Sequence, residues 1–150
     1  ALLESFGPGD IYIKGANALD PQGNAAVLMG SPTGGTIGAA MAILHARGGR
    51  LILPVSLQKL IPSVSAATGL FGIGTVDRTT GGQVGYMPIM AGSATLISEV
   101  GARGILYGLR AVPGEAGGLD DCAGAISLHR TGNSAGINAA FDWLETLRDG

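Results

Sequence analysis

The sequence lacks the residues from which disulfides and most metal clusters are built. Cys122 is its only cysteine, which excludes an internal disulfide and any cysteine-based metal cluster. His129 has no cysteine or carboxylate at ligand spacing, and His45 is expected in the last turn of a helix, where an imidazole favours the helix dipole. We therefore predict no metal site.

Charge and long apolar runs are also scarce. Charged residues make up 13% of the chain and the net charge is −2, which leaves no basic surface for nucleic acid or an anionic membrane. No apolar run approaches the ~20 residues of a membrane span, and the opening ALLESFG lacks a basic signal-peptide head. We expect a cytoplasmic protein with no nucleic-acid or membrane partner.

Glycine, by contrast, is abundant, at 27 of 150 residues against a usual share of about 7%. The glycines follow no period, which excludes collagen-like and solenoid folds, and they gather between apolar runs as tight turns require. With 46% apolar residues, the chain is long enough for one domain over residues 1–150 with a substantial core. A subdivision is possible near the glycine-dense segment 69–85, where we predict no helix or strand.

The first half predicts strands and one helix. Apolar runs indicate strands at 11–14, 25–29 and 51–55, and the turn formers at 20–24 (DPQGN) suggest a hairpin-like reversal. A helix is expected at 35–47, ended by two glycines, with an apolar face formed by Ile37, Met41 and Leu44.

The second half predicts a β-α-β-β-α unit. Strands are expected at 86–90, 104–112 and 123–130, with a helix at 93–101. A final helix begins near Ser134 as cap and ends before Gly150, with apolar residues at Ile137, Ala140, Phe141, Leu144 and Leu147. The predicted fold class is α/β, with a mainly parallel, Rossmann-like first half and an α+β second half.

The segment SPTGGT at 31–36 precedes the first predicted helix. Free N–H groups of that helix's first turn would favour an anion, the glycines allow close approach, and the threonines add hydroxyl donors. The loop lacks the spacing of a P-loop, and an ordinary turn with Thr36 as helix cap is the alternative. Two lysines follow strands and could converge on this edge, with solvated surface lysines as the alternative. The candidate ligand-binding residues are Lys14, Asn17, Asp20, Ser31, Thr33, Gly34, Gly35, Thr36 and Lys59.

Residues 10–62 resemble the superfamily of ribose-5-phosphate isomerase, glucosamine-6-phosphate deaminase, CoA transferases and lactate-utilisation proteins. In the isomerases a strand ends in Asp-Gly-Ala-Asp, and an Asp-Pro turn, a strand, a glycine run opening a helix, and a Ser-Lys pair follow. The corresponding segments here are Lys14-Gly15-Ala16-Asn17, Asp20-Pro21, Gly30–Gly35 and Gln58-Lys59-Leu60. The lactate-utilisation branch shares the Gly-Ala-Asn-Ala sequence.

The chain departs from the isomerase pattern at the catalytic positions. Lys14 and Asn17 replace the two aspartates, and no carboxylate lies between Thr33 and Ala46, where the isomerases carry their base. Isomerisation needs a base, so we expect no sugar-phosphate isomerase activity. Nine residues precede the matching core, where relatives carry a strand and a phosphate loop. We expect a fragment, a partner that supplies that part, or a rearranged fold.

The resulting hypothesis is a domain that binds a small anionic molecule: a phosphate, a carboxylate or a CoA-like anion. Alternatives are a non-catalytic structural or assembly subunit and an enzyme active only with a partner chain. The sequence identifies neither a catalytic residue nor a cofactor. We expect a homo-oligomer or a complex with a second chain, with Trp143 and the strand at 51–55 as contact surfaces.

Overall fold

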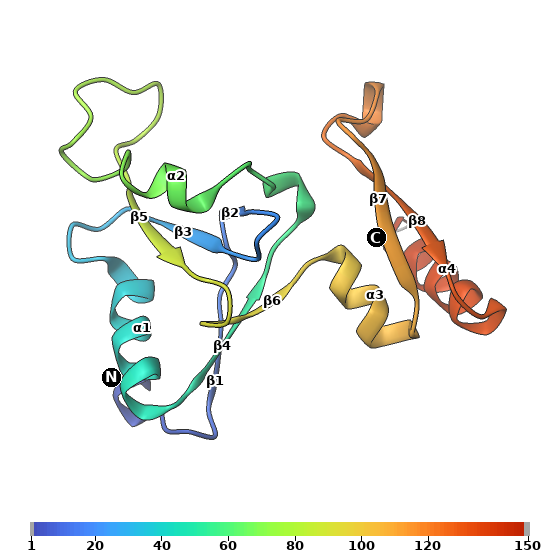
Figure 1. Cartoon of the computed structure of the whole chain (residues 1–150), viewed down its shortest axis with the longest axis horizontal. Helices are drawn as coiled ribbons and strands as arrows, with labels where there is room; N and C mark the ends of the chain where they lie inside the picture. The colour runs from blue at the N-terminus through green and yellow to red at the C-terminus, as the bar shows by residue number, and fades with distance from the viewer. Residues whose placement is uncertain (1, 149–150) are drawn as a thin grey trace. The chain divides into compact units, whose positions relative to one another are not determined.

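A computed structural model describes residues 2–148 and divides the chain into two compact units. Unit 1 comprises the chain up to Val55 together with Lys59–Leu96, and unit 2 comprises Ser56–Gln58 together with the chain from Ile97 onward. Figure 1 shows both units, which are described separately below. The glycine-dense segment 69–85 lies within unit 1.

Unit 1 contains a sheet with a parallel pair of strands. Its strand order is β1 (Ile11–Ile13), β4 (Arg50–Pro54) and β6 (Thr95–Ile97), and β1 pairs with β4 in parallel. Leu51, Leu53 and Val55 are buried. The expectation that the 51–55 strand offers an open contact surface is therefore wrong, because β4 has a neighbour on each side.

The second sheet of unit 1 is antiparallel. The short strand β2 (Ala18–Leu19) and the longer β5 (Gly85–Ile89) flank β3 (Ala25–Met29). The strand predicted at 25–29 and the reversal at 20–24 are confirmed, whereas β2 is too short to leave a pattern. Because the parallel pair is confined to one sheet, the fold is mixed α/β.

Two helices belong to unit 1. Helix α1 (Gly35–Arg47) has the predicted bounds, buries Ile37, Ala40 and Leu44, and ends where the Gly48 N–H donates to Leu44 O. Helix α2 (Val64–Thr68) follows a cap in which Ser63 accepts from Ala66 N at 3.1 Å. The described residues also contain three short turns of 3-10 helix, at Leu2–Ser5, Leu57–Lys59 and Asp120–Cys122.

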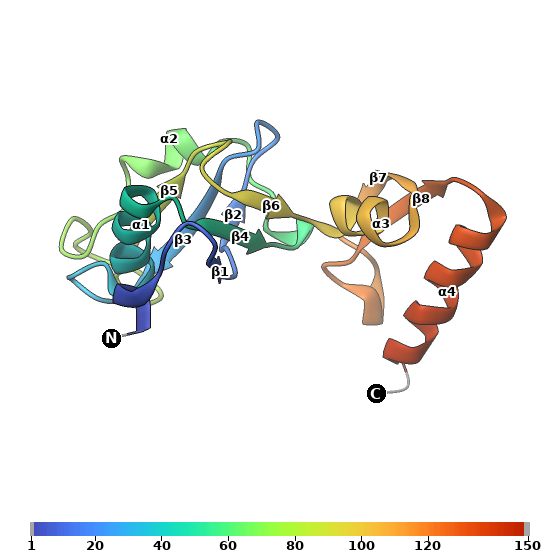
Figure 2. The ribbon, with the colours of Figure 1, turned by 90° about the horizontal axis from the view of Figure 1, so that it is seen from below.

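Unit 2 contains a helix, a hairpin and a second helix. Helix α3 (Glu99–Tyr107) contacts both β7 (Arg110–Ala116) and α4 (Ser134–Arg148). Strand β7 pairs antiparallel with β8 (Ile126–Thr131), as Figure 2 shows from below. Within residues 2–148, no helix is both long and apolar enough to cross a membrane.

Two predictions in this region are wrong. The segment predicted as a helix at 93–101 contains β6, and the strand predicted at 104–112 is divided, because residues 104–107 belong to α3 and only residues 110–112 lie in β7. Residues 104–107 (GILY) resemble a strand in composition, but they complete the helix that begins at Glu99. Gly108 then ends α3 with φ 63°, and its N–H donates to carbonyls of that helix.

The final helix is confirmed, but its cap lies one residue earlier than predicted. Asn133 Oδ1 accepts from Gly136 N at 2.7 Å, and Ser134 is the first helical residue. An asparagine satisfies the first-turn N–H groups as well as a serine does. The predicted end at Gly150 lies outside the described residues.

Candidate functional site

The glycine loop leads from β3 into α1. The Gly34 N–H donates to Ser31 O at 3.0 Å, which closes a tight turn. Gly34 and Gly35 both have positive φ, 84° and 58°, a conformation that side chains disfavour. No side chain caps α1, so the alternative of Thr36 as cap is wrong. The first-turn N–H groups of α1 therefore have no partner within the helix.

Two hydroxyls extend this row of donors. Ser31 Oγ and Thr33 Oγ1 lie 2.9 Å apart, and Ser31 Oγ also accepts from Thr33 N at 3.3 Å. One hydroxyl proton is used between the two side chains, so the other is free to donate to a ligand. The loop thus offers neutral donors.

Ser31 and Gly34 line a cavity of about 290 Å³. Two aromatic residues also line it: the rings of Phe71 and Tyr86 stack with centroids 4.7 Å apart and planes at 21°. Phe71 is 42% exposed. The lining of this cavity, here called the glycine-loop cavity, therefore combines hydrogen-bond donors with a pair of stacked aromatic rings.

Met29, at the end of β3, also lines this cavity. A Cβ added at Gly85 would lie 3.1 Å from Met29 Cε, and one at Gly34 would lie 3.6 Å from Met29 Sδ. The absence of a side chain at Gly85 leaves room for the Met29 thioether, which is a soft apolar group.

Asn17 and Lys59 are both hydrogen-bonded to the protein. Asn17 Oδ1 accepts from Leu28 N at 3.0 Å, which fixes Asn17 beside strand β3. Lys59 Nζ donates to Ala16 O at 2.8 Å, which places its ammonium next to the residue before Asn17. The Lys14 side chain makes no hydrogen bond within residues 2–148. None of the three lines the glycine-loop cavity.

Asp20 is buried, 3% exposed, and its carboxylate is surrounded by donors. It accepts from Gln22 N at 3.0 Å, and from Asn24 N, Asn24 Nδ2 and Val64 N at 2.9 Å each. Burial raises the pKa of Asp20, but these hydrogen bonds together lower it by more than burial raises it. The pKa of Asp20 therefore lies below its ordinary value. We assign Asp20 to holding the 20–24 turn and the start of α2.

Tyr86 and Phe71, the aromatic residues of the cavity, are among the lining residues that the sequence does not predict. The Tyr86 hydroxyl is buried and has no hydrogen-bond partner among the described residues. Burial and then the Asp20 charge raise the pKa of Tyr86, so it stays protonated. The sequence signal that could have indicated this part of the cavity is an aromatic residue, Phe71, within a glycine-dense segment.

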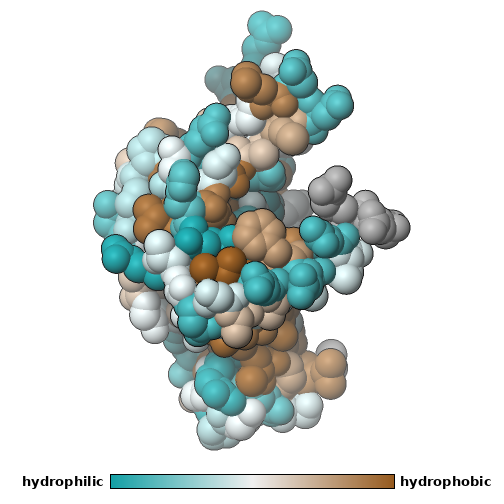
Figure 3. Space-filling view, turned by 90° about the vertical axis from the view of Figure 1, so that its right-hand side faces the viewer, coloured by the Kyte–Doolittle hydropathy of each residue, from teal (hydrophilic) through white to brown (hydrophobic). Residues whose placement is uncertain are grey.

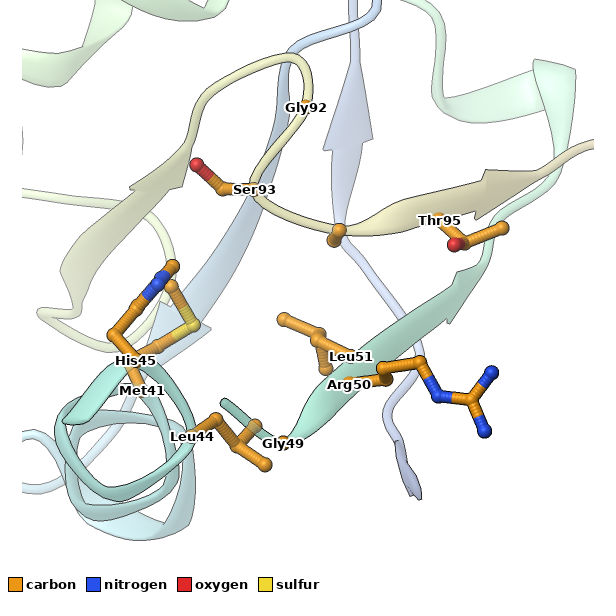
Figure 4. Close-up of a pocket in the computed structure, with 10 residues that line it drawn as sticks. Met41, Leu44, His45, Gly49, Arg50, Leu51, Gly92, Ser93 and Thr95 are labelled. Atoms are coloured by element: carbon orange, nitrogen blue, oxygen red, sulfur yellow. The ribbon is translucent and has the colours of Figure 1, made fainter. Parts of the chain in front are cut away.

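A second cavity of unit 1, also about 290 Å³, lies beside α1, β4 and β6 (Figure 4). His45, Arg50, Ser93 and Thr95 are among its lining residues. Figure 4 shows the Arg50 guanidinium directed away from His45 and Ser93. Because these polar groups do not converge, we assign no ligand to this cavity.

Comparison with protein-family models, curated proteins and solved structures found no significant match to this chain. The structure itself shows a mixed α/β protein with a glycine-loop cavity.

Proposed function

We propose that this chain binds a small molecule that joins an anionic group, a phosphate or carboxylate, to a flat apolar group. The observation that carries the proposal is that the glycine loop and the stacked pair Phe71–Tyr86 line one cavity. Its volume, about 290 Å³, is at the lower end of the range for ligand sites.

Each wall of the cavity suits one part of such a ligand. Ser31, Pro32 and Gly34 line the cavity, whereas Thr33, Gly35 and Thr36 do not. Helix α1 begins directly after Gly34, and its first turn offers free N–H groups and the positive end of the helix dipole, which favour an anion nearby. Gly34 and Gly35 both have positive φ, so neither carries a side chain that would keep a ligand away from the backbone at the start of α1. An aromatic wall suits a planar group, because base–aromatic stacking is worth about 1–3 kcal/mol.

The superfamily resemblance of residues 10–62 favours the same function. The superfamily members named above act on sugar phosphates or CoA derivatives, and the resemblance implies a glycine run that opens a helix, in which SPTGGT lies here. The parallel β1–β4 pair and the entry of β3 into α1 through the loop are compatible with this relationship.

Adenosine monophosphate, which joins a phosphate to a flat base, is the probe that tests this proposal. We expect it to raise the melting temperature saturably, because a ligand that binds only the folded state stabilises it. Phe71→Ala should weaken binding about tenfold, since stacking is lost. Ser31→Ala should weaken both this nucleotide and inorganic phosphate. Calorimetric titration measures each affinity.

Leu70→Ala is the matched control, because Leu70 is an exposed apolar neighbour of Phe71 that does not line the cavity. It should bind the nucleotide as the unchanged protein does. If sodium chloride at equal ionic strength gave the same stabilisation, or if Phe71→Ala bound normally, the proposed site would be refuted.

We also expect no ribose-5-phosphate isomerase activity. Helix α1 holds no Asp or Glu, and its only histidine, His45, lies in its last turn, away from the glycine loop. Without a base at the loop end of the helix, a proton cannot be moved between adjacent sugar carbons. Turnover of ribose 5-phosphate is measured on homogeneous protein. Activity that disappears in Lys14→Ala would contradict this expectation.

An assembly role is the second candidate, favoured by apolar side chains on the surface of unit 2 (Figure 3). The large apolar residues exposed among the described residues of unit 2 are Ile105, Leu106, Val112, Leu119, Phe141, Trp143 and Leu147. Monomers rarely leave contiguous apolar patches of more than a few hundred Å² uncovered. We propose on this ground a homo-oligomer or a second chain.

A further inference from the structure

Unit 2 contains an apolar groove of about 280 Å³ between α3, β8 and α4. Leu106, Trp143, Leu144 and Leu147 supply apolar lining. Two cations, Arg103 of α3 and Arg130 of β8, line the same groove. An apolar groove that also holds two guanidiniums is unusual, because a charged group near apolar surface loses hydration.

The Arg130 side chain is held in place by an aromatic ring, but one of its nitrogens lacks a hydrogen-bond partner among the described residues. Its Cζ lies 4.0 Å from the centre of the Phe141 ring, a cation–π contact that fixes the side chain. Its Nη1 atom is buried and has no hydrogen-bond partner among the described residues. A buried N–H without an acceptor costs free energy that a bound oxygen atom would recover.

Arg103 adds a second charge close to the first. Burial, and then the positive charge of Arg130, lower the pKa of Arg103, whereas the charge of Glu99 raises it. The Glu99 carboxylate is already engaged, because it accepts from Leu57 N at 2.9 Å and is hydrogen-bonded to the Ser56 side chain. Glu99 lines the groove together with both arginines, so the lining carries two positive charges and one negative charge, an excess of positive charge.

We propose that this groove binds a small monocarboxylic acid with an apolar chain or ring, whose carboxylate contacts Arg130 and Arg103. The apolar body lies against Trp143, Leu144 and Leu147, and a carboxylate oxygen accepts from Arg130 Nη1. Arginine suits this role because its planar fork matches a carboxylate. The groove is about twice the size of a cavity that holds benzene, ~150 Å³, so it fits a medium-length chain or one substituted ring. The site is separate from the glycine-loop cavity and does not depend on the function proposed there.

Three probes of equal chain length test the proposal on the full chain: octanoate, octanol and octylamine. Trp143 is the only tryptophan and is 48% exposed, so its fluorescence reports directly on the groove. We expect octanoate to change the emission saturably at neutral pH. Octanol should bind at least tenfold more weakly, because it lacks the charge, and octylamine should not bind.

Arg130→Gln should weaken octanoate at least tenfold while leaving octanol unchanged. Arg110→Gln is the matched control, since Arg110 is an exposed arginine of unit 2 that does not line the groove. If Arg130→Gln fails to fold, as circular dichroism would show, Arg103→Gln replaces it with the same expected loss. Equal binding of octanoate and octanol, unchanged octanoate affinity in the folded variant, or a fluorescence change that tracks dimer formation by light scattering would each overturn the proposal.

Discussion

Replacing Asp20 with alanine is expected to lower the free energy of unfolding by about 2–4 kcal/mol. The carboxylate accepts four N–H bonds from Gln22, Asn24 and Val64, and alanine would leave buried donors unpaired. Each unsatisfied buried donor costs about 1–3 kcal/mol, partly recovered where water can enter. Urea denaturation at neutral pH measures the change.

The same carboxylate should give the protein a dependence on acid. The pKa of Asp20 is lower in the folded chain than in the unfolded chain. The ionised carboxylate therefore makes its full contribution to the free energy of unfolding at pH values above the unfolded pKa of about 3.9. It is lost as the pH falls through the folded pKa. Asp20→Ala should therefore lose less stability on acidification than the unchanged protein. The control Asp77→Ala removes an exposed carboxylate and should change stability by less than ~0.5 kcal/mol. A loss in Asp20→Ala no larger than in Asp77→Ala would contradict the assigned role.

Leu53→Ala should produce the other large effect, a loss of about 2–5 kcal/mol in unfolding free energy. Leu53 is 0% exposed on β4, the middle strand of its sheet, so alanine would leave a cavity. Thermal or urea unfolding measures the loss.

Ile13→Ala on the neighbouring strand β1 is the control, since Ile13 is 64% exposed and its replacement should cost far less. Light scattering should give the same mass for both variants as for the unchanged protein, because a buried core residue cannot contact a second chain. If Leu53→Ala retained full stability but changed the mass, Leu53 would belong to an interface after all.

The predicted elements that are right have strong local signals. Helix α1 has an apolar face at helical spacing and two glycines at its end, and β3 is an uninterrupted apolar run. Helix α3 is the contrary case. Its glycines at 101 and 104 weaken helix propensity, and its last turn reads GILY. Packing against β7 and α4 determines its conformation, and no local pattern reports such packing.

The candidate site divides in the same way. The sequence predicts the glycine loop, because positive φ and a following helix depend on neighbouring residues. It does not predict the aromatic wall, since Phe71 and Tyr86 meet only through the tertiary fold. Asp20 is singled out by the sequence as a ligand contact, whereas its bonds to Asn24 and Val64 show it serving the turn.

The short segment Ser56–Gln58 has a consequence for how the chain is made. It belongs to unit 2, where Leu57 donates to Glu99, yet residues 59–96 of unit 1 are synthesised between them. Chains emerge from the ribosome N-terminal end first, and units usually fold in that order. Unit 1 can therefore fold during synthesis only if it leaves these three residues outside its own packing. Unit 2 completes its folding later, when the chain from Ile97 onward packs against Ser56–Gln58, which is synthesised earlier.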